Sequence, residues 1–102
     1  MSIRQRVAEL VYAAVDDLNE LLPADKHLNK SPETPLLGPD TRLESLDLVD
    51  LIIGIEQRLQ DELKLVVTLV DEKAMSLQRS PFRTLESMTD YVAQIVAHKS
   101  DG

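Results

Sequence analysis

The chain has 102 residues, and its 18 acidic and 11 basic side chains give a formal charge of −7, which repels nucleic-acid phosphates and argues against a nucleic-acid partner. The absence of cysteine excludes a disulfide framework and a thiolate metal site. The length allows one domain, residues 1–102, and because the sequence has no long apolar run and no signal-peptide core, we expect a monomeric cytoplasmic protein without a membrane span.

A first helix is predicted over residues 3–22. Ser2 followed by Gln5 has the form of a capping box, and Pro23 cannot continue a helix. Apolar residues make up 43% of the chain and aromatic residues only 3%, so Leu, Ile and Val must build the core. The residues at core spacing in this helix are Ile3, Val7, Leu10, Val11, Ala14, Leu18 and Leu21 or Leu22.

Residues 23–43 are predicted to form a long loop, because they contain several prolines and show no sustained periodicity. A loop of this length in a small domain is often functional. Leu36 and Leu37 should hold its middle against the helices. His27 has no second His or Cys nearby, so we interpret it as a solvated loop residue and predict no metal site.

A central helix is predicted from Ser45 or Leu46 to about Leu63. Its inward stripe consists of Leu48, Leu51, Ile52, Ile55 and Leu59. Ser45 occupies the position of a helix N-cap, a common place for serine. The exposed amide groups at a helix start also favour a bound phosphate, so the serine can be a cap alone or a phosphate-bearing residue.

The opposite face of this helix mixes acidic residues with small apolar ones. It carries Asp47, Val49, Asp50, Ile53, Glu56 and Gln57. An acidic face can simply be solvated. Apolar residues ringed by charge are also what a transient docking surface needs, because apolar contact supplies affinity and charge supplies orientation. Gly54 within the helix costs about 1 kcal/mol relative to Ala, which close approach of another helix or of a bound chain could explain.

The run Leu65–Val70 has strand propensity, but no second run exists to pair with it. We therefore predict an apolar loop, followed by a short helix over about 69–77 with Thr68 as its cap. Phe82 should fill the core just before the last helix. That helix begins after Thr84 and ends near Lys99. The residues that should face the core are Leu85, Met88, Val92, Ile95 and Val96.

No catalytic constellation is present. The sequence has no cysteine nucleophile and no glycine-rich phosphate loop, and its two histidines lie in a loop and in a terminal turn. We therefore do not expect an enzyme. The predicted elements make an all-α bundle of three longer helices and one short third helix, with a long loop between the first two.

The residues around Ser45 resemble a known signature. Glu44-Ser45-Leu46-Asp47-Leu48 resembles the acidic-Ser-Leu motif of acyl and peptidyl carrier proteins, and Thr84–Val92 looks like the start of that family's last helix. The chain departs from the family where Glu44 replaces the usual Asp and Arg42 stands in place of Gly. The departures, with extra residues near Pro81, suggest a specialised carrier and not the housekeeping one.

The resemblance implies a four-helix acyl-carrier-like bundle in which Ser45 carries a 4′-phosphopantetheine arm. The arm would hold acyl or aminoacyl groups as thioesters, and a phosphopantetheinyl transferase, oriented by Glu44 and Asp47, would attach it. Enzymes of fatty-acid, polyketide or related biosynthesis, with basic docking patches, would be the other partners. The surface they would meet, called the docking face below, consists of Glu44, Leu46, Asp47, Val49, Asp50, Ile53 and Glu56.

A second alignment remains possible. Thr41–Leu46 also resembles the segment that precedes the motif in many carriers, and in that register no serine stands at the attachment position. The chain would then be an acidic helical interaction module with a carrier-like fold and no prosthetic group.

Overall fold

The computed structural model describes residues 2–38, 41, 43–69 and 82–101, without the side chains of Ser45, Ser100 and Asp101. Its elements, in chain order, are α1 (Ile3–Leu21), the 3₁₀ turn η1 (Ala24–Lys26), α2 (Ser45–Leu63) and α3 (Leu85–Asp101). The all-α prediction is confirmed. The predicted short helix over 69–77 lies, apart from its first residue, outside the described residues.

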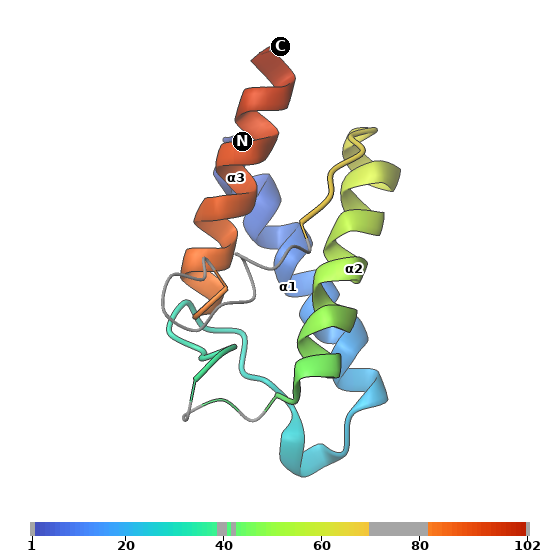
Figure 1. The fold of residues 1–102 in the computed structure, drawn as a ribbon, viewed down its shortest axis with the longest axis vertical. Helices are drawn as coiled ribbons and strands as arrows, with labels where there is room; N and C mark the ends of the chain where they lie inside the picture. Colours follow the sequence, from blue (N-terminus) through green and yellow to red (C-terminus); the bar gives the residue numbers. More distant parts are fainter. Residues whose placement is uncertain (1, 39–40, 42, 70–81, 102) are drawn as a thin grey trace.

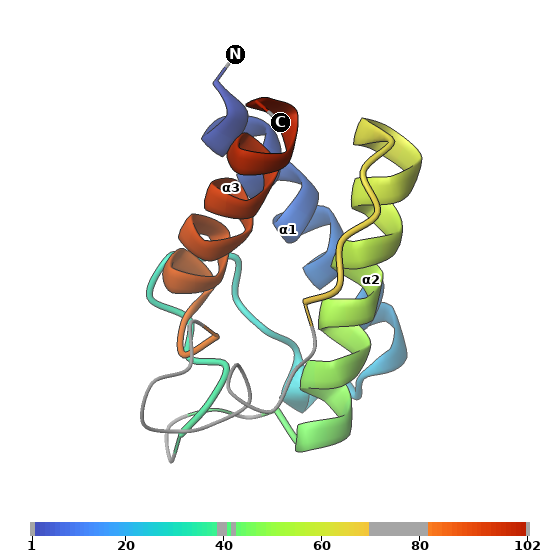
Figure 2. The same ribbon diagram turned by 45° about the horizontal axis from the view of Figure 1, so that its top comes forward.

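The other two long helices pack on α1. α2 and α3 each contact α1 and run antiparallel to it, so they flank it on two sides (Figure 1). As a result, the start of α1 and the ends of α2 and α3 meet at one end of the bundle. The start of α2 lies at the opposite end, beside η1 (Figure 2).

α1 forms as its local sequence predicts. The Ser2 Oγ accepts from the Gln5 N–H at 3.1 Å, and the Gln5 Oε1 accepts from the Ser2 N–H at 3.1 Å. The face buried against the other helices consists of Val7, Leu10, Val11, Ala14, Val15 and Leu18. Ile3 is 42% exposed, so its prediction as a core residue is wrong. Of the two alternatives at the end of the helix, Leu22 packs against the core and Leu21 is 78% exposed. Ile3 and Leu21 lie in the terminal turns, at the two ends of the bundle.

α2 buries the whole stripe that its periodicity predicts: Leu48, Leu51, Ile52, Ile55 and Leu59. Gly54 lies where α2 passes α1. A Cβ at Gly54 would stand 4.0 Å from the Ala14 Cβ, an ordinary van der Waals contact. The approach of α1 therefore leaves room for a methyl group and does not require glycine at this position.

Gly54→Ala should raise the free energy of unfolding by about 1 kcal/mol, because alanine restricts the unfolded chain and the methyl group fits beside Ala14. Urea unfolding with an unchanged m-value would measure this gain. Gly38→Ala is the contrast: Gly38 has φ +100°, so this change should destabilise by about 1–2 kcal/mol. Destabilisation by Gly54→Ala would mean that α1 and α2 lie closer than described.

The long loop is fixed at several points. The Asn19 side chain pairs with both backbone groups of Leu28, accepting from its N–H at 2.8 Å and donating to its carbonyl at 3.1 Å. The Leu36 N–H donates to the Arg83 carbonyl at 2.7 Å, which joins the middle of the loop to the turn before α3. Leu36 is buried and Leu37 half-buried, so both hold the loop as predicted.

After α2 the chain reverses and runs back along that helix (Figure 2). Lys64 ends α2 in the left-handed conformation, with φ 59°. In the extended segment that follows, Val67 and Leu69 are buried and Leu65 is partly buried, while Val66 is 70% exposed. The segment has the alternation of a strand without a partner strand among the described residues, which confirms the loop prediction for 65–69.

α3 begins at Leu85, after Thr84. The Thr84 Oγ1 accepts from the Ser87 N–H at 3.1 Å, and the Ser87 Oγ accepts from the Thr84 N–H at 3.0 Å, which satisfies two donors at the helix start. Phe82 is fully buried just before this cap, as predicted. None of the helices in the described ranges combines the length and the apolar character needed to cross a membrane.

Candidate functional site

The N-cap of α2 lies one residue earlier than predicted. Ser45 is the first residue of the helix, and Glu44 is its N-cap. Glu44 and Asp47 form a capping box, in which the Asp47 carboxylate accepts from the Glu44 N–H at 3.3 Å. The prediction of Ser45 as N-cap is therefore wrong by one position, because acids three residues apart, at 44 and 47, can cap this helix without the serine.

The residues on both sides of Ser45 lie at the surface. Leu46 is 76% exposed, and the Glu44 side chain is 71% exposed. Lys26 of η1 approaches from the long loop and places its Nζ 3.7 Å from the Glu44 carboxylate. The sequence alone could not identify this lysine, because it lies in a loop without periodicity.

A small hollow of about 180 Å³ opens beside this helix start. Leucines make up most of its wall, and Glu44 stands at its edge. The residues that line it are Leu36, Leu37, Gly38, Thr41, Leu43, Glu44 and Leu48. The same leucines that hold the long loop thus form an apolar recess next to the first turn of α2.

Most of the predicted docking face is open to solvent. Leu46 and Ile53 are exposed apolar residues, at 76% and 40%, and Asp50 is exposed between them. Asp47 and Val49 are half-buried. Because positions 46, 50 and 53 recur at helical spacing, these side chains lie on one side of α2. They form an acidic surface with exposed apolar points.

Glu56 differs from the other residues of the docking face. Its side chain is half-buried, and its carboxylate accepts a hydrogen bond from the Leu69 N–H. Glu56 therefore holds the extended segment 65–69 against α2, a role that sequence reasoning missed. Periodicity placed Glu56 on the outer face correctly but carried no information about which later segment would cover it.

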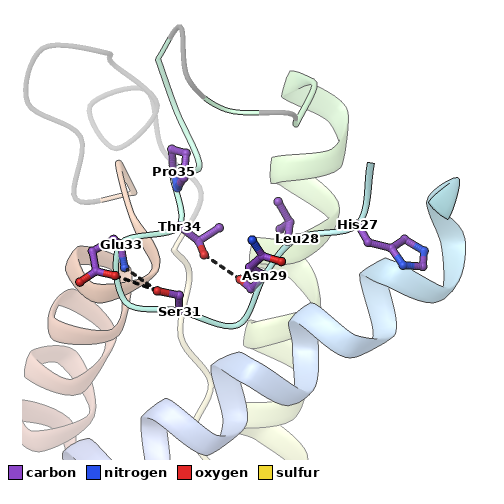
Figure 3. Close-up of a pocket in the computed structure, with 7 residues that line it drawn as sticks. All are labelled: His27, Leu28, Asn29, Ser31, Glu33, Thr34 and Pro35. Atoms are coloured by element: carbon purple, nitrogen blue, oxygen red, sulfur yellow. Dashed lines mark hydrogen bonds between the residues drawn. The ribbon is translucent and has the colours of Figure 1, made fainter. Parts of the chain in front are cut away.

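A second hollow, of about 330 Å³, lies within the long loop and is lined by His27, Leu28, Asn29, Ser31, Glu33, Thr34 and Pro35 (Figure 3). The Thr34 hydroxyl donates to the Asn29 carbonyl at 2.7 Å, and the Ser31 hydroxyl donates to the Glu33 carboxylate at 2.9 Å. These groups satisfy one another. His27 Nε2 lies 3.0 Å from the Leu22 carbonyl. Over the described ranges, no three His, Cys, Asp or Glu side chains gather in a way that could hold a metal ion.

Arg58, near the C-terminal end of α2, forms hydrogen bonds that stabilise the fold. Its guanidinium donates to Asp17 of α1 at 2.6 Å and to Glu62 at 3.3 Å. The hydrogen bond to Asp17 raises the pKa of Arg58 above its usual value. This cation joins α1 to α2 through Asp17 and pairs with Glu62 within α2.

Comparisons of the chain with protein-family models, with curated proteins and with solved structures find no match.

Proposed function

We propose that this chain is a carrier protein that holds acyl or aminoacyl groups on a 4′-phosphopantetheine arm attached to Ser45. The observation that supports it most is that α2 begins at Ser45 while the residues on either side, Glu44 and Leu46, are exposed. A transferase can reach a helix start with this exposure. Residues 69–77 would add the short third helix of a four-helix bundle.

The residues around Ser45 fit such a group in two respects. The first amides of α2 stand at the positive end of a helix, which favours a phosphate. The leucine-lined recess beside them, with Leu37 and Leu48 in its wall, can shelter the apolar part of an arm or cargo. The negative charges of Glu44 and Asp47 would repel a phosphate. The Lys26 Nζ, which lies 3.7 Å from the Glu44 carboxylate, offsets part of that charge.

The arm, when bound, would supply a terminal thiol for thioester chemistry, which a chain without cysteine cannot supply itself. The chain's own residues would position and present it. The capping box of Glu44 and Asp47 fixes the direction of the first turn of α2. The exposed Leu46, Asp50 and Ile53 offer partner enzymes an apolar contact with an acidic surround, which suits fast, weak docking on basic patches.

Ser45→Ala should abolish attachment of the arm. The protein is incubated with coenzyme A and a phosphopantetheinyl transferase, and its intact mass is measured. We expect wild type to gain the mass of one phosphopantetheine and Ser45→Ala to gain nothing. Ser31→Ala, which changes a serine of the long loop, should be modified like wild type.

The second candidate is an interaction module without an arm, favoured by the exposed Leu46 and Ile53, since this surface can bind a basic partner unaided. If several transferases leave the wild-type mass unchanged, the module is the better description. Modification of a different residue would overturn the assignment of Ser45.

A further inference from the structure

A third hollow is lined by residues from the start of α1, the end of α2 and α3, whereas Ser45 is the first residue of α2 and so lies at the other end of that helix. Figure 1 shows that the start of α1 and the ends of α2 and α3 share one end of the bundle. The volume of the hollow is about 160 Å³, and it is lined by Ile3, Arg6, Leu63, Leu65 and Val96. Ile3 and the neighbouring Val66 are exposed, at 42% and 70%. The hollow is therefore a concave site whose wall is apolar except for Arg6.

One cation lines this hollow, and two more belong to the segments that form it. Arg6 lines it, Lys64 lies between two of its lining residues, and Lys99 donates to the Val66 carbonyl at 3.0 Å. All three are exposed, and none pairs with a carboxylate in the described part of the chain. We call the hollow with these cations the basic hollow. In a chain of charge −7 it is a local positive site.

The size of the basic hollow indicates what it can hold. Sites for small molecules and cofactors usually measure about 300–1,000 Å³. A cavity of about 150 Å³ holds a group the size of benzene. At about 160 Å³, the basic hollow therefore fits a single apolar side chain, the kind of anchor that fills a pocket in a protein interface. Cations spread around it favour an anchor flanked by several carboxylates.

The docking face of this same chain has that chemistry. Leu46 is 76% exposed and is flanked by Glu44, Asp47 and Asp50. Leu46 and Leu63 stand 17 residues apart on α2, so about 25 Å of helix separates the docking face from the basic hollow. A single copy therefore cannot bring its docking face into contact with its own basic hollow. Two copies can bring these two surfaces together.

We propose that two copies of this chain pair head to tail, with Leu46 of one copy in the basic hollow of the next. The carboxylates around Leu46 then face Arg6, Lys64 and Lys99. An interface with one anchor is small, so the association is weak and becomes visible only at high concentration. Pairing covers the docking face, and a partner with a basic patch therefore competes with the second copy. The pairing goes beyond carriage and does not require modification of Ser45.

Sedimentation velocity of the unmodified protein from micromolar to millimolar concentration tests the pairing. Wild type should show a rising mean mass that high salt reverses. Arg6→Glu with Lys64→Glu removes the basic hollow, and Leu46→Gln with Asp50→Lys removes the docking face. Each double variant should stay monomeric alone. Their equimolar mixture should form a 1:1 complex that cannot grow, because only one complementary pair of surfaces remains.

Matched controls separate this pairing from general effects of charge or hydrophobicity. Arg83→Glu makes the same charge change as Arg6→Glu on the turn before α3, and Leu21→Gln changes a leucine with 78% exposure at the end of α1. Both should associate like wild type, and circular dichroism should show equal helicity in all variants.

A monomeric wild type at millimolar concentration overturns the proposal, as does a mixture of the double variants that stays monomeric. Binding of a monomeric wild type to phosphatidylserine vesicles through Arg6 would also overturn it. None of these results bears on attachment to Ser45.

Discussion

Phe82→Ala should cost about 3–5 kcal/mol of stability, the largest loss expected from a single substitution in this chain. Phe82 is fully buried, and its ring meets Tyr91 edge to face, with centroids 5.5 Å apart and an interplanar angle of 79°. Truncation would leave a cavity in the core beside Tyr91. Because domains of this size are stable by only about 5–15 kcal/mol, a large share of the total would be lost.

Thermal and urea unfolding would measure this loss, with an expected fall in Tm of more than about 10 °C. Phe82→Leu is the control: it keeps most of the apolar volume and should cost less than half as much. Tyr91→Leu removes only the edge-to-face partner and should cost about 0.5–1.5 kcal/mol. If the free energy of unfolding of Phe82→Ala were within about 1 kcal/mol of the wild-type value, the loss would be that of an exposed site. Phe82 could then not be a core residue.

Glu56→Ala should cost about 1.5–3 kcal/mol, the usual range for a hydrogen bond to a charged group. The Glu56 carboxylate accepts from the Leu69 N–H, and Leu69 is 1% exposed. An extended segment without a partner strand has few acceptors for its amides, so removal of the carboxylate leaves a buried donor without its partner. The segment 65–69 should then detach locally before the bundle unfolds.

Amide hydrogen exchange at Leu69 distinguishes this local effect from global destabilisation. Exchange should accelerate at the amides of residues 67 and 69 in Glu56→Ala. At amides in the middle of α1, the exchange rate should change only by the amount that the loss of global stability accounts for. Glu56→Gln keeps an acceptor and should lose less. Asp50→Ala removes an exposed acid from the same helix and should stay within about 0.5 kcal/mol of wild type. Equal exchange at Leu69 in wild type and Glu56→Ala would show that this hydrogen bond does not hold the segment.

The docking face therefore combines two kinds of residue. Leu46, Asp50 and Ile53 are exposed, whereas Glu56 contributes to the fold. A substitution at Glu56 that weakens partner binding would need a stability measurement beside it, since loss of the segment 65–69 could produce the same result. Leu46→Gln and Asp50→Lys do not share this ambiguity.

Local sequence determined the helices of this protein. Capping pairs such as Ser2 with Gln5, and apolar spacing such as that from Leu48 to Leu59, act within a few residues. The bounds of α1 and α2 could therefore be predicted to within a residue, together with most of the buried face of each. Pro23 ended α1 by the same short-range sterics. The position of Ser45 at the start of α2 was predictable to within one residue for this reason.

Tertiary structure alone decided which distant residues meet. The contact of Lys26 with Glu44, the hydrogen bond of Glu56 to Leu69 and the exposure of Ile3 all depend on how the helices and the long loop pack. Helical and strand periodicities describe which way a side chain points and not what lies opposite it. The basic hollow is the clearest case, because its cations come from three segments that are far apart in sequence and converge only when both flanking helices pack antiparallel to α1.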